Sequence, residues 1–331
     1  MDFLKDQSIL ITGGTGSFGQ AFVSTLLQSK FKPRKICVYS RDELKQSQMQ
    51  ILFPENEFPH LRFFLGDIRD KERLSFALKD VDIVVHAAAL KQVPAAEYNP
   101  FEFIKTNTLG SQNLIDACIQ NKITRVVALS TDKAAAPINL YGATKLCSDK
   151  LFLASNNIIG NTDISFSVVR YGNVLGSRGS VIPHFLRIAS ENGEYFPITH
   201  KDMTRFNITL DEGVQTVIWA LEHGVGGEII IPKIPSYRIT DVALAIDPKM
   251  PIKEIGIRPG EKLHEEMITF SDAPFTVESA DKYLILHPEI MSTYPKELYS
   301  NYLPEGFSYN SLENTQFLDV NDIRNLIKEN L

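Results

Sequence analysis

Six short runs of apolar residues, most of them rich in β-branched or aromatic side chains, recur in the first half of the chain. They are Ser8–Thr12, Lys35–Tyr39, Leu61–Leu65, Asp82–His86, Arg125–Ser130 and Phe166–Arg170. Within each run the apolar residues follow one another almost without interruption, instead of alternating with polar ones. Such runs are typical of strands that are buried on both faces, as in a parallel sheet.

Longer segments with helical periodicity lie between most of these runs, for example Phe18–Ser29 and Thr108–Gln120. Strands that alternate with helices predict repeated strand–helix–strand units, which build a parallel sheet with helices on both faces. The predicted fold class is therefore α/β, a doubly wound parallel sheet of the Rossmann type.

The pattern changes after Arg170, where Pro and Gly become frequent. This change predicts a smaller, loop-rich domain that supplies the second wall of a cleft. A predicted helix over Asp211–Leu221 and a predicted strand over Glu228–Ile231 suggest that the chain returns to the main sheet. The predicted division is 1–170 for cofactor binding with a return segment 208–233, and 171–207 with 234–331 for substrate binding. The tail beyond residue 270 is less periodic and predicts no clear element.

Composition and charge narrow the class of protein. Of 331 residues, 44% are hydrophobic and 22% charged, and the net charge is -6, as expected of a soluble protein with a large core. The negative charge argues against a nucleic-acid surface. No run of about 18 apolar residues is long enough to span a membrane. The N-terminus leads into a glycine loop and not into a signal-peptide cleavage site, so we expect a cytoplasmic protein.

The three cysteines, Cys37, Cys118 and Cys147, form no CxxC pair and have no His at a metal-ligand spacing. We interpret them as buried thiols and expect no metal site.

A glycine-rich loop follows the first predicted strand and opens the first helix. Glycines at 13, 16 and 19 give GxxGxxG spacing. Gly allows a tight turn and a close approach of the backbone to a pyrophosphate, and the helix N-terminus presents N–H groups to the phosphates. The context of strand and helix makes this a predicted dinucleotide site. Its candidate residues are Gly13, Thr15, Gly16, Ser17, Phe18 and Gly19.

The residues after the second strand predict the form of the dinucleotide. An acidic residue there usually bonds the ribose of NAD, whereas Arg accommodates the 2′-phosphate of NADP. Ser40, Arg41 and Lys45 can all bind a phosphate, so NADP is favoured. The alternative is that Asp42 or Glu43 binds the ribose of NAD.

Two further segments at strand ends are predicted to contact the cofactor. Asp67 and Ile68 follow the third strand, where an Asp can accept from the adenine amino group. Ala87, Ala88 and Ala89 follow the fourth strand, where small side chains allow the backbone to pass close to the cofactor.

Tyr141 and Lys145 are four residues apart on a helix that Asn139 is predicted to cap, so they share a face. An ammonium near a phenol stabilises the phenolate, and we expect it to lower the pKa of Tyr141 from about 10 toward neutrality. Lys145 can also bond the nicotinamide ribose. The predicted apolar face of this helix consists of Leu140, Ala143, Cys147, Leu151 and Ala154.

Thr131, Asp132 and Lys133 follow the fifth strand, at the sheet edge where cofactor clefts form in this class of fold. Thr131 can donate to a substrate oxygen. Asp132 is a candidate general acid if its pKa is raised, and Lys133 a candidate general base if its pKa is lowered. Elsewhere such a pair would be read as a surface ion pair. Its place beside the Tyr141 helix favours catalysis.

Motifs along most of the chain resemble the extended short-chain dehydrogenases/reductases that act on nucleotide sugars. They are GGTGSFG (13–19), YSRDELK (39–45), GDIRD (66–70), HAAALKQVPAAEYNP (86–100), TNTLG (106–110), STDKAAAPINLYGATK (130–145), RYGNVLGSRGSVIP (170–183), MTRFNITLDEGV (203–214) and RPGEKLHE (258–265). Within that family the chain is most similar to the UDP-N-acetylglucosamine 4,6-dehydratases. More narrowly, the chain resembles the soluble C5-inverting dehydratases of the pseudaminic acid pathway. The features that carry this resemblance are Tyr141, the Asp132–Lys133 pair and the lack of a predicted membrane segment.

This resemblance implies a redox-neutral reaction with a tightly bound NADP that is regenerated in each turnover. Tyr141 would remove the 4-OH proton while C4 is oxidised. Lys133 would then remove the C5 proton, and Asp132 would protonate the leaving C6 hydroxyl. The expected product is UDP-2-acetamido-2,6-dideoxy-β-L-arabino-hex-4-ulose. Closure of the cleft and the nicotinamide charge would depress the pKa of Lys133. The substrate-binding candidates are Lys91, Asn173, Arg205, Arg258 and Glu261.

Three other functions remain open at this point. A UDP-sugar 4-epimerase would need only the Tyr and the cofactor, which leaves Asp132 and Lys133 without a role. A C5-retaining dehydratase would differ in the product's configuration. A non-catalytic NADP-sensing regulator would typically lack the Tyr–Lys pair. The resemblance also implies a homo-oligomer, with a hexamer expected.

Overall fold

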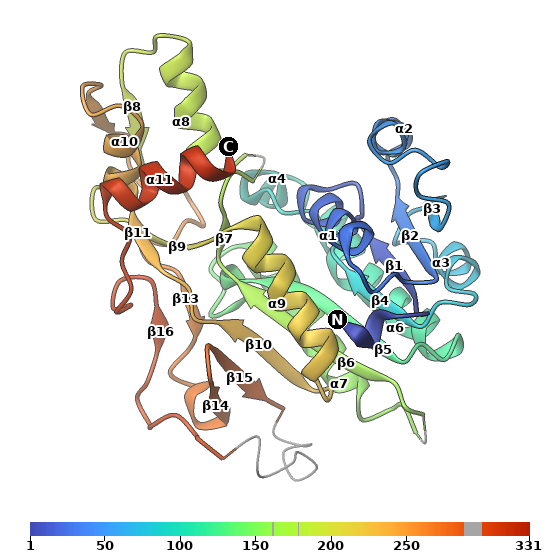
Figure 1. Ribbon diagram of the computed structural model, residues 1–331. Coiled ribbons are helices and arrows are strands. Elements are labelled where there is room, and N and C mark those ends of the chain that lie inside the picture. The colour runs from blue at the N-terminus through green and yellow to red at the C-terminus, as the bar shows by residue number, and fades with distance from the viewer. Residues whose placement is uncertain (161, 178, 288–299) are drawn as a thin grey trace.

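The computed structural model describes residues 1–160, 162–177, 179–287 and 300–331, and a nine-stranded sheet runs through its larger part (Figure 1). The strand order is β14-β15-β10-β6-β5-β4-β1-β2-β3. The bounds are β1 Ser8–Thr12, β2 Lys35–Ser40, β3 Leu61–Leu65, β4 Ile83–His86, β5 Arg125–Thr131, β6 Ser165–Tyr171, β10 Glu228–Pro232, β14 Thr276–Ser279 and β15 Lys282–Leu286.

The predicted doubly wound sheet is confirmed. Strands β1 to β6 and β10 are parallel, and the order reverses at β1, which pairs with β2 on one side and β4 on the other. Every residue of β1 and β4 is buried, as continuous apolar runs require. Ligands of such sheets bind at the carboxyl ends of the strands near this reversal.

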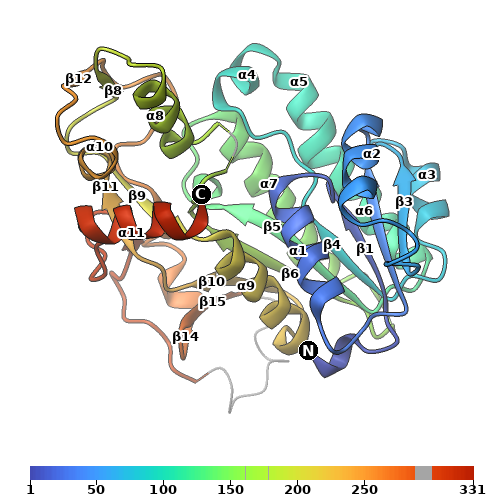
Figure 2. The ribbon, with the colours of Figure 1, turned by 45° about the horizontal axis from the view of Figure 1, so that its top comes forward.

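Helices cover both faces of the sheet (Figures 1 and 2). Helices α1 and α9 pack together on one face, and α3, α6 and α7 follow one another on the other. The predicted helices of the first half lie within two residues of observed ones. The bounds are η1 Asp2–Leu4, α1 Ser17–Gln28, α2 Glu43–Leu52, α3 Lys71–Ala77, α4 Val93–Tyr98, α5 Pro100–Phe103, η2 Ile104–Leu109, α6 Gly110–Gln120, η3 Asp132–Ala134, α7 Leu140–Ser155 and α9 Leu210–His223.

The predicted apolar face of α7 is wrong. Cys147 on that face is exposed, unlike the buried Cys37 and Cys118. The helix instead buries a largely polar face, which includes Ser148 and Asp149. Both are hydrogen-bonded: Ser148 lies 2.9 Å from Ser111 of α6, and Asp149 accepts from Ser130 of β5 at 2.7 Å. Hydrogen bonds therefore anchor α7 where apolar packing was expected, since buried polar groups are tolerated when paired.

The smaller domain has its own core, formed around Phe185, Phe196, Tyr237, Val242 and Ile323. In its three small sheets β9 pairs with β11 and β7, β12 with β8, and β13 with β16. The bounds are β7 Asn173–Val174, α8 Val181–Ser190, β8 Phe196–Ile198, β9 Thr204–Ile208, β11 Ser236–Arg238, α10 Ile239–Ile246, β12 Ile252–Glu254, β13 Glu266–Ile268, η4 Ala273–Phe275, β16 Tyr309–Asn310 and α11 Val320–Asn330.

The chain crosses between the two parts more often than the predicted division allows. The expected return forms α9 and β10, and β10 pairs with β6. Strands β14 and β15 also join the main sheet, although 234–331 was assigned to the smaller domain. Strand β15 pairs antiparallel with β10, and β14 pairs antiparallel with β15 at the sheet edge; these are long-range contacts that local periodicity does not reveal. Residues 288–299 of that segment lie outside the described residues.

None of the helices in the described ranges combines the length and the apolar composition that crossing a membrane requires.

Candidate active site

The glycine loop between β1 and α1 has the form of a phosphate cradle. Gly13 has a φ of +66°, and a Cβ there would lie 2.8 Å from the Ala88 backbone nitrogen. A Cβ at Gly19 would lie 2.4 Å from Gly14 Cα. The first helical turn has no side-chain cap, so its N–H groups point outward from Gly16. This part of the chain fits a dinucleotide pyrophosphate.

The predicted cofactor residues of the first and fourth strand ends lie together. The loop and the first turns of α1 carry Gly13, Thr15, Gly16, Ser17, Phe18 and Gly19, and the segment after β4, which contains Ala87, Ala88 and Ala89, lies against Gly13.

The segment after β2 uses its acidic residue internally. Asp42 caps α2 by accepting from the Lys45 backbone at 3.0 Å, and its carboxylate pairs with the Lys45 ammonium at 2.9 Å. Ser40 accepts from Gln46 at 3.0 Å. Arg41, with 49% of its side chain exposed, lies 3.5 Å from Asp67. A ribose phosphate would meet an accessible guanidinium here.

The end of β3 contributes Asp67 and Ile68 to the same edge. The Asp67 carboxylate is also bound by Arg69 at 2.7 Å, while Ile68 is buried against Gly110 of α6.

Asp132 is buried completely at the end of β5, in the first turn of η3. Its Oδ1 accepts from the Thr131 hydroxyl at 3.0 Å and from Lys133 Nζ at 2.9 Å, whereas Oδ2 has no hydrogen-bond partner in the described part of the chain. Burial raises the pKa of Asp132, although the charge of Lys133 opposes this effect. A raised pKa is the condition stated above for Asp132 as a candidate general acid.

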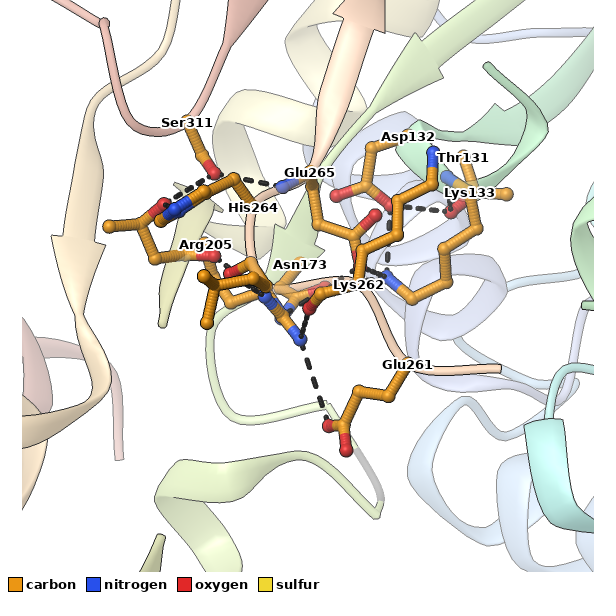
Figure 3. A network of polar contacts seen from close by, with 12 residues as sticks. Thr131, Asp132, Lys133, Asn173, Arg205, Glu261, Lys262, His264, Glu265 and Ser311 are labelled. Carbon is orange, nitrogen blue, oxygen red and sulfur yellow. Dashed lines mark hydrogen bonds and ion pairs between the residues drawn. The ribbon is translucent and has the colours of Figure 1, made fainter. Parts of the chain in front are cut away.

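Lys133 lies between two carboxylates. Its Nζ is 2.9 Å from Asp132 Oδ1 and 3.2 Å from Glu265 Oε1, and it donates to Asn173 Oδ1 at 3.3 Å (Figure 3). Burial would lower the pKa of Lys133, but the two negative charges outweigh burial and raise it. The expected depressed pKa is therefore wrong for this structure. The reason is Glu265, whose proximity the sequence did not reveal.

Tyr141 is buried on the first turn of α7, beside the Thr131 hydroxyl. Burial raises the pKa of Tyr141 to about 12, even though Lys133 and Thr131 oppose it. The expected lowering is therefore wrong here. Lys145 donates to the Leu129 carbonyl at 2.7 Å, and burial lowers its own pKa while Asp149 opposes. Two of the groups that can favour the phenolate, Lys133 and Thr131, come from the segment after β5.

The predicted substrate residues are only partly brought together. Arg205 is 3.7 Å from Glu261, and Arg258, with 62% of its side chain exposed, is 3.9 Å from the same carboxylate. Asn173 contacts Lys133, as described above. Lys91 is exposed on the segment between β4 and α4.

Arg205 is buried, and its guanidinium donates to backbone carbonyls of Thr204, Lys262 and Leu263 at 2.7 to 3.1 Å. Its donors therefore hold the loop 258–265 in place, which differs from the expected exposed phosphate binder.

Three further residues join the network without having been predicted. Glu265 pairs with Lys133, and Ser311 accepts from the Glu265 backbone at 2.9 Å (Figure 3). The buried Tyr237 lies beside the Asn173 side chain. Glu265 ends the quoted motif RPGEKLHE, which was the available signal. Nothing in the local sequence marks Tyr237 or Ser311, since each reaches the site from a distant segment.

The site thus unites a raised-pKa carboxyl, an amine and a phenol beside a dinucleotide cradle. The described residues contain no group of three or more His, Cys, Asp or Glu side chains that could hold a metal ion.

Comparisons with known proteins identify relatives of the chain. A family model described as "Polysaccharide biosynthesis protein" matches residues 9–287. A UDP-N-acetylglucosamine 4,6-dehydratase (inverting) of Campylobacter jejuni subsp. jejuni is 52% identical over 329 residues, 97% of each chain. A UDP-glucose 4-epimerase of Rickettsia conorii is 42% identical over 286 residues, 85% of this chain and 83% of its own. The X-ray structure of Pen from Bacillus thuringiensis has a TM-score of 0.90, 36% identity, and coverage of 99% and 98%.

Proposed function

This chain belongs to the polysaccharide biosynthesis protein family and has an extended short-chain dehydrogenase/reductase fold, and on that premise we propose that it is a UDP-N-acetylglucosamine 4,6-dehydratase that inverts C5. The observation that carries the proposal is the buried Asp132–Lys133 pair at the end of β5, beside Tyr141. Elimination of water needs an acid and a base besides the redox base, whereas epimerisation needs only the redox base.

The proposed cofactor is NAD(P), bound by the cradle of β1 and α1 and by the segment after β2. When bound, the cofactor would supply reversible hydride transfer, which the reaction needs at C4 and at C6. NADP is the finer proposal, supported by the exposed guanidinium of Arg41 and by the internal use of Asp42. Lys145 would bond the nicotinamide ribose.

Oxidation at C4 requires that the 4-OH proton leave, and Tyr141 is the proposed acceptor. Its raised pKa keeps the phenol protonated at neutral pH in the free protein. The positive charge of Lys133 and the Thr131 hydroxyl favour the phenolate and supply part of the activation that Tyr141 needs.

Elimination follows, because a ketone at C4 acidifies the C5 hydrogen. Lys133 removes the C5 proton, and Asp132 protonates the C6 oxygen, which leaves as water. The 2.9 Å contact lets one proton pass from Lys133 to Asp132, which converts both groups to their reactive forms without a change in net charge. Tyr141 holds the proton from the 4-OH and Lys133 the proton from C5, and one of these two residues delivers its proton to the opposite face of C5, which completes the inversion.

The UDP moiety would bind across the smaller domain. Arg258 is the proposed diphosphate ligand because its guanidinium is exposed, and Arg pairs with phosphate through two hydrogen bonds. Asn173, Glu261 and Lys91 are proposed contacts to the sugar or ribose. Arg205 supports this site through the loop 258–265.

The proposal includes a homo-oligomer. The face of α7 that carries Cys147 and Ala154 is at the surface of the single chain, and Phe101 of α5 is 61% exposed. Sedimentation velocity measures the assembly, and a monomer at micromolar concentration would contradict this part of the proposal.

The decisive experiment incubates the purified protein with UDP-N-acetylglucosamine and NADP. Mass spectrometry should show loss of one water, and proton NMR of the fresh product should show the L-arabino configuration. A xylo product would indicate C5 retention. An isomer of unchanged mass would indicate an epimerase, the activity named for the Rickettsia relative. The inverted product would fit the first step of pseudaminic acid biosynthesis.

A further inference from the structure

Glu265 lies deep between the two domains, immediately before β13. Only 2% of it is exposed. Its Oε1 is 3.2 Å from Lys133 Nζ and 3.7 Å from Arg205 Nε, while Oε2 has no hydrogen-bond partner in the ranges that the structure describes. A carboxylate this far from solvent needs such cations, because desolvation strongly disfavours an isolated charge.

Separate contacts fix the loop 258–265 against the catalytic segment. The Asn139 amide donates to the Gly260 carbonyl at 2.7 Å, and the Lys262 ammonium donates to the Ala135 carbonyl at 2.7 Å. The Glu265 backbone donates to Ser311 at 2.9 Å. Since none of these bonds involves the Glu265 carboxylate, the approach of Glu265 to Lys133 does not depend on their ion pair alone.

The four charges of this cluster balance. Asp132 and Glu265 are negative and Lys133 and Arg205 positive, and the contacts run Asp132–Lys133–Glu265–Arg205 (Figure 3). If the proton of Lys133 moves to Asp132, the Glu265–Arg205 pair remains neutral as a unit. Glu265 is thus the carboxylate still charged beside Lys133 when the amine takes a new proton.

We propose that Glu265 is a positioning residue for the elimination, which holds Lys133 and stabilises the ammonium that forms as the C5 proton is removed. The inference rests on the proposed function. In this step the C5–H bond breaks and its proton moves to the Lys133 lone pair. The electron pair moves through the C4 ketone and expels the C6 oxygen, which takes the Asp132 proton and leaves as water. Glu265 forms and breaks no covalent bond. Its negative charge interacts more strongly with the Lys133 ammonium that forms than with the neutral Lys133 amine, so it stabilises the transition state of proton removal.

The test compares Glu265→Gln with the adjacent Glu266→Gln, which removes a partly buried carboxylate outside the cluster. Single turnovers with UDP-N-acetylglucosamine are followed by the absorbance of reduced nicotinamide and by NMR of the product. In Glu265→Gln, elimination should slow by about 100-fold, as for loss of one preorganised charge partner. Oxidation at C4 and KM should change by less than about threefold, so reduced nicotinamide accumulates. Glu266→Gln should behave like the wild type.

A pH profile separates positioning from a general structural defect. Loss of one negative charge beside Lys133 should move the basic limb of the elimination rate to lower pH in Glu265→Gln. Glu265→Asp keeps the negative charge but moves it away from Lys133 by the length of one methylene. The elimination rate of this variant should therefore fall, while the basic limb of its pH profile stays at the wild-type pH. If Glu265→Gln does not fold, Glu265→Asp alone still tests the proposal through its elimination rate.

The outcomes distinguish failure of the proposed function from failure of the proposed role of Glu265. A wild-type protein that releases no water from the sugar overturns the proposed function and the role of Glu265 together. The wild type could instead make the inverted keto sugar while both Glu265 variants eliminate water at the wild-type rate, with the same basic limb of the pH profile. That result would overturn the role of Glu265 alone.

Discussion

At the scale of single residues, two kinds of position govern this site. Some allow only one residue for steric reasons, as at Gly19, where any Cβ would collide with the Gly14 backbone. Others depend on charge, as at Lys133, where two carboxylates set the protonation state. Each kind gives a direct test.

Gly19→Ala should weaken binding of the dinucleotide at least about tenfold and lower the free energy of unfolding by about 1–3 kcal/mol, because the new Cβ would lie 2.4 Å from backbone that cannot move freely. Gly213→Ala in α9 is the control, since its Cβ meets only Tyr171, at 3.9 Å. That change should be neutral or stabilise by up to about 1 kcal/mol. Calorimetric titration and chemical denaturation measure both. Equal behaviour of the two variants would contradict the steric argument.

Lys133→Ala should slow elimination by about 10²- to 10⁴-fold, the usual contribution of a general base. Oxidation at C4 should slow much less, because Lys133 supplies only part of the activation of Tyr141. Reduced nicotinamide should then accumulate in a single turnover. Lys150→Ala, on the exposed side of α7, is the matched control and should turn over normally. Full dehydration by the Lys133 variant would exclude this lysine as the base.

At the scale of elements, α7 depends on its ends and its polar anchors more than on an apolar stripe. Asn139 caps the helix by accepting from the Gly142 backbone at 2.8 Å, and the same side chain donates to Gly260 of the loop 258–265. One residue thus sets the start of the catalytic helix and ties it to the smaller domain. The cap was predictable from the sequence; the tie was not.

Asn139→Ala should lower the free energy of unfolding by about 1 kcal/mol through loss of the cap. It should also lower kcat/KM about tenfold, because Tyr141 lies in the first turn of α7. Thr209→Ala removes the cap of α9, a helix that makes none of the described contacts of the Asp132–Lys133 pair, and should cost similar stability without the loss of activity. Denaturation and steady-state kinetics decide, and equal activity of the two variants would show that the tie to Gly260 is unimportant.

At the scale of the whole molecule, the chain passes repeatedly between the sheet and the smaller domain (Figure 2). Strand β10 completes the parallel part of the sheet and begins with a buried carboxyl, Glu228, which accepts from Ser167 of β6 at 2.6 Å. Its Oε2 has no hydrogen-bond partner among the described residues. Burial raises its pKa from 4.5 to about 7, although Ser167 and nearby backbone N–H groups oppose the shift.

This carboxyl predicts a pH dependence of stability. The folded protein binds the Glu228 proton more tightly than the unfolded chain, so this contribution is complete below pH 4.5 and is lost as the pH rises through about 7. The loss amounts to at most about 3 kcal/mol. Glu228→Gln should flatten the profile and be the more stable form at pH 8, whereas Glu191→Gln at the surface should follow the wild type. Chemical denaturation at several pH values measures the stability of all three proteins. Stability profiles that run parallel for the three proteins would contradict the role of Glu228.

The sequence by itself determined the alternation of strands and helices, the dinucleotide loop and the grouping of Asp132, Lys133 and Tyr141. These features depend on local periodicity, on steric demands at glycines and on the rule that carboxyl ends of parallel strands share one edge. Even the capped start of α7 could be inferred from Asn139 alone, because capping is a contact between near neighbours.

Only the tertiary structure decided the buried face of α7, the charge state of Lys133 and the part that Glu265 takes in the site. Each depends on groups from segments far apart in the chain: Ser111 and Ser130 against α7, and the loop 258–265 against η3. Periodicity distinguishes polar from apolar positions, but it cannot show that a buried polar group has found a partner. The pKa of a lysine likewise depends on which charges folding brings within a few ångströms.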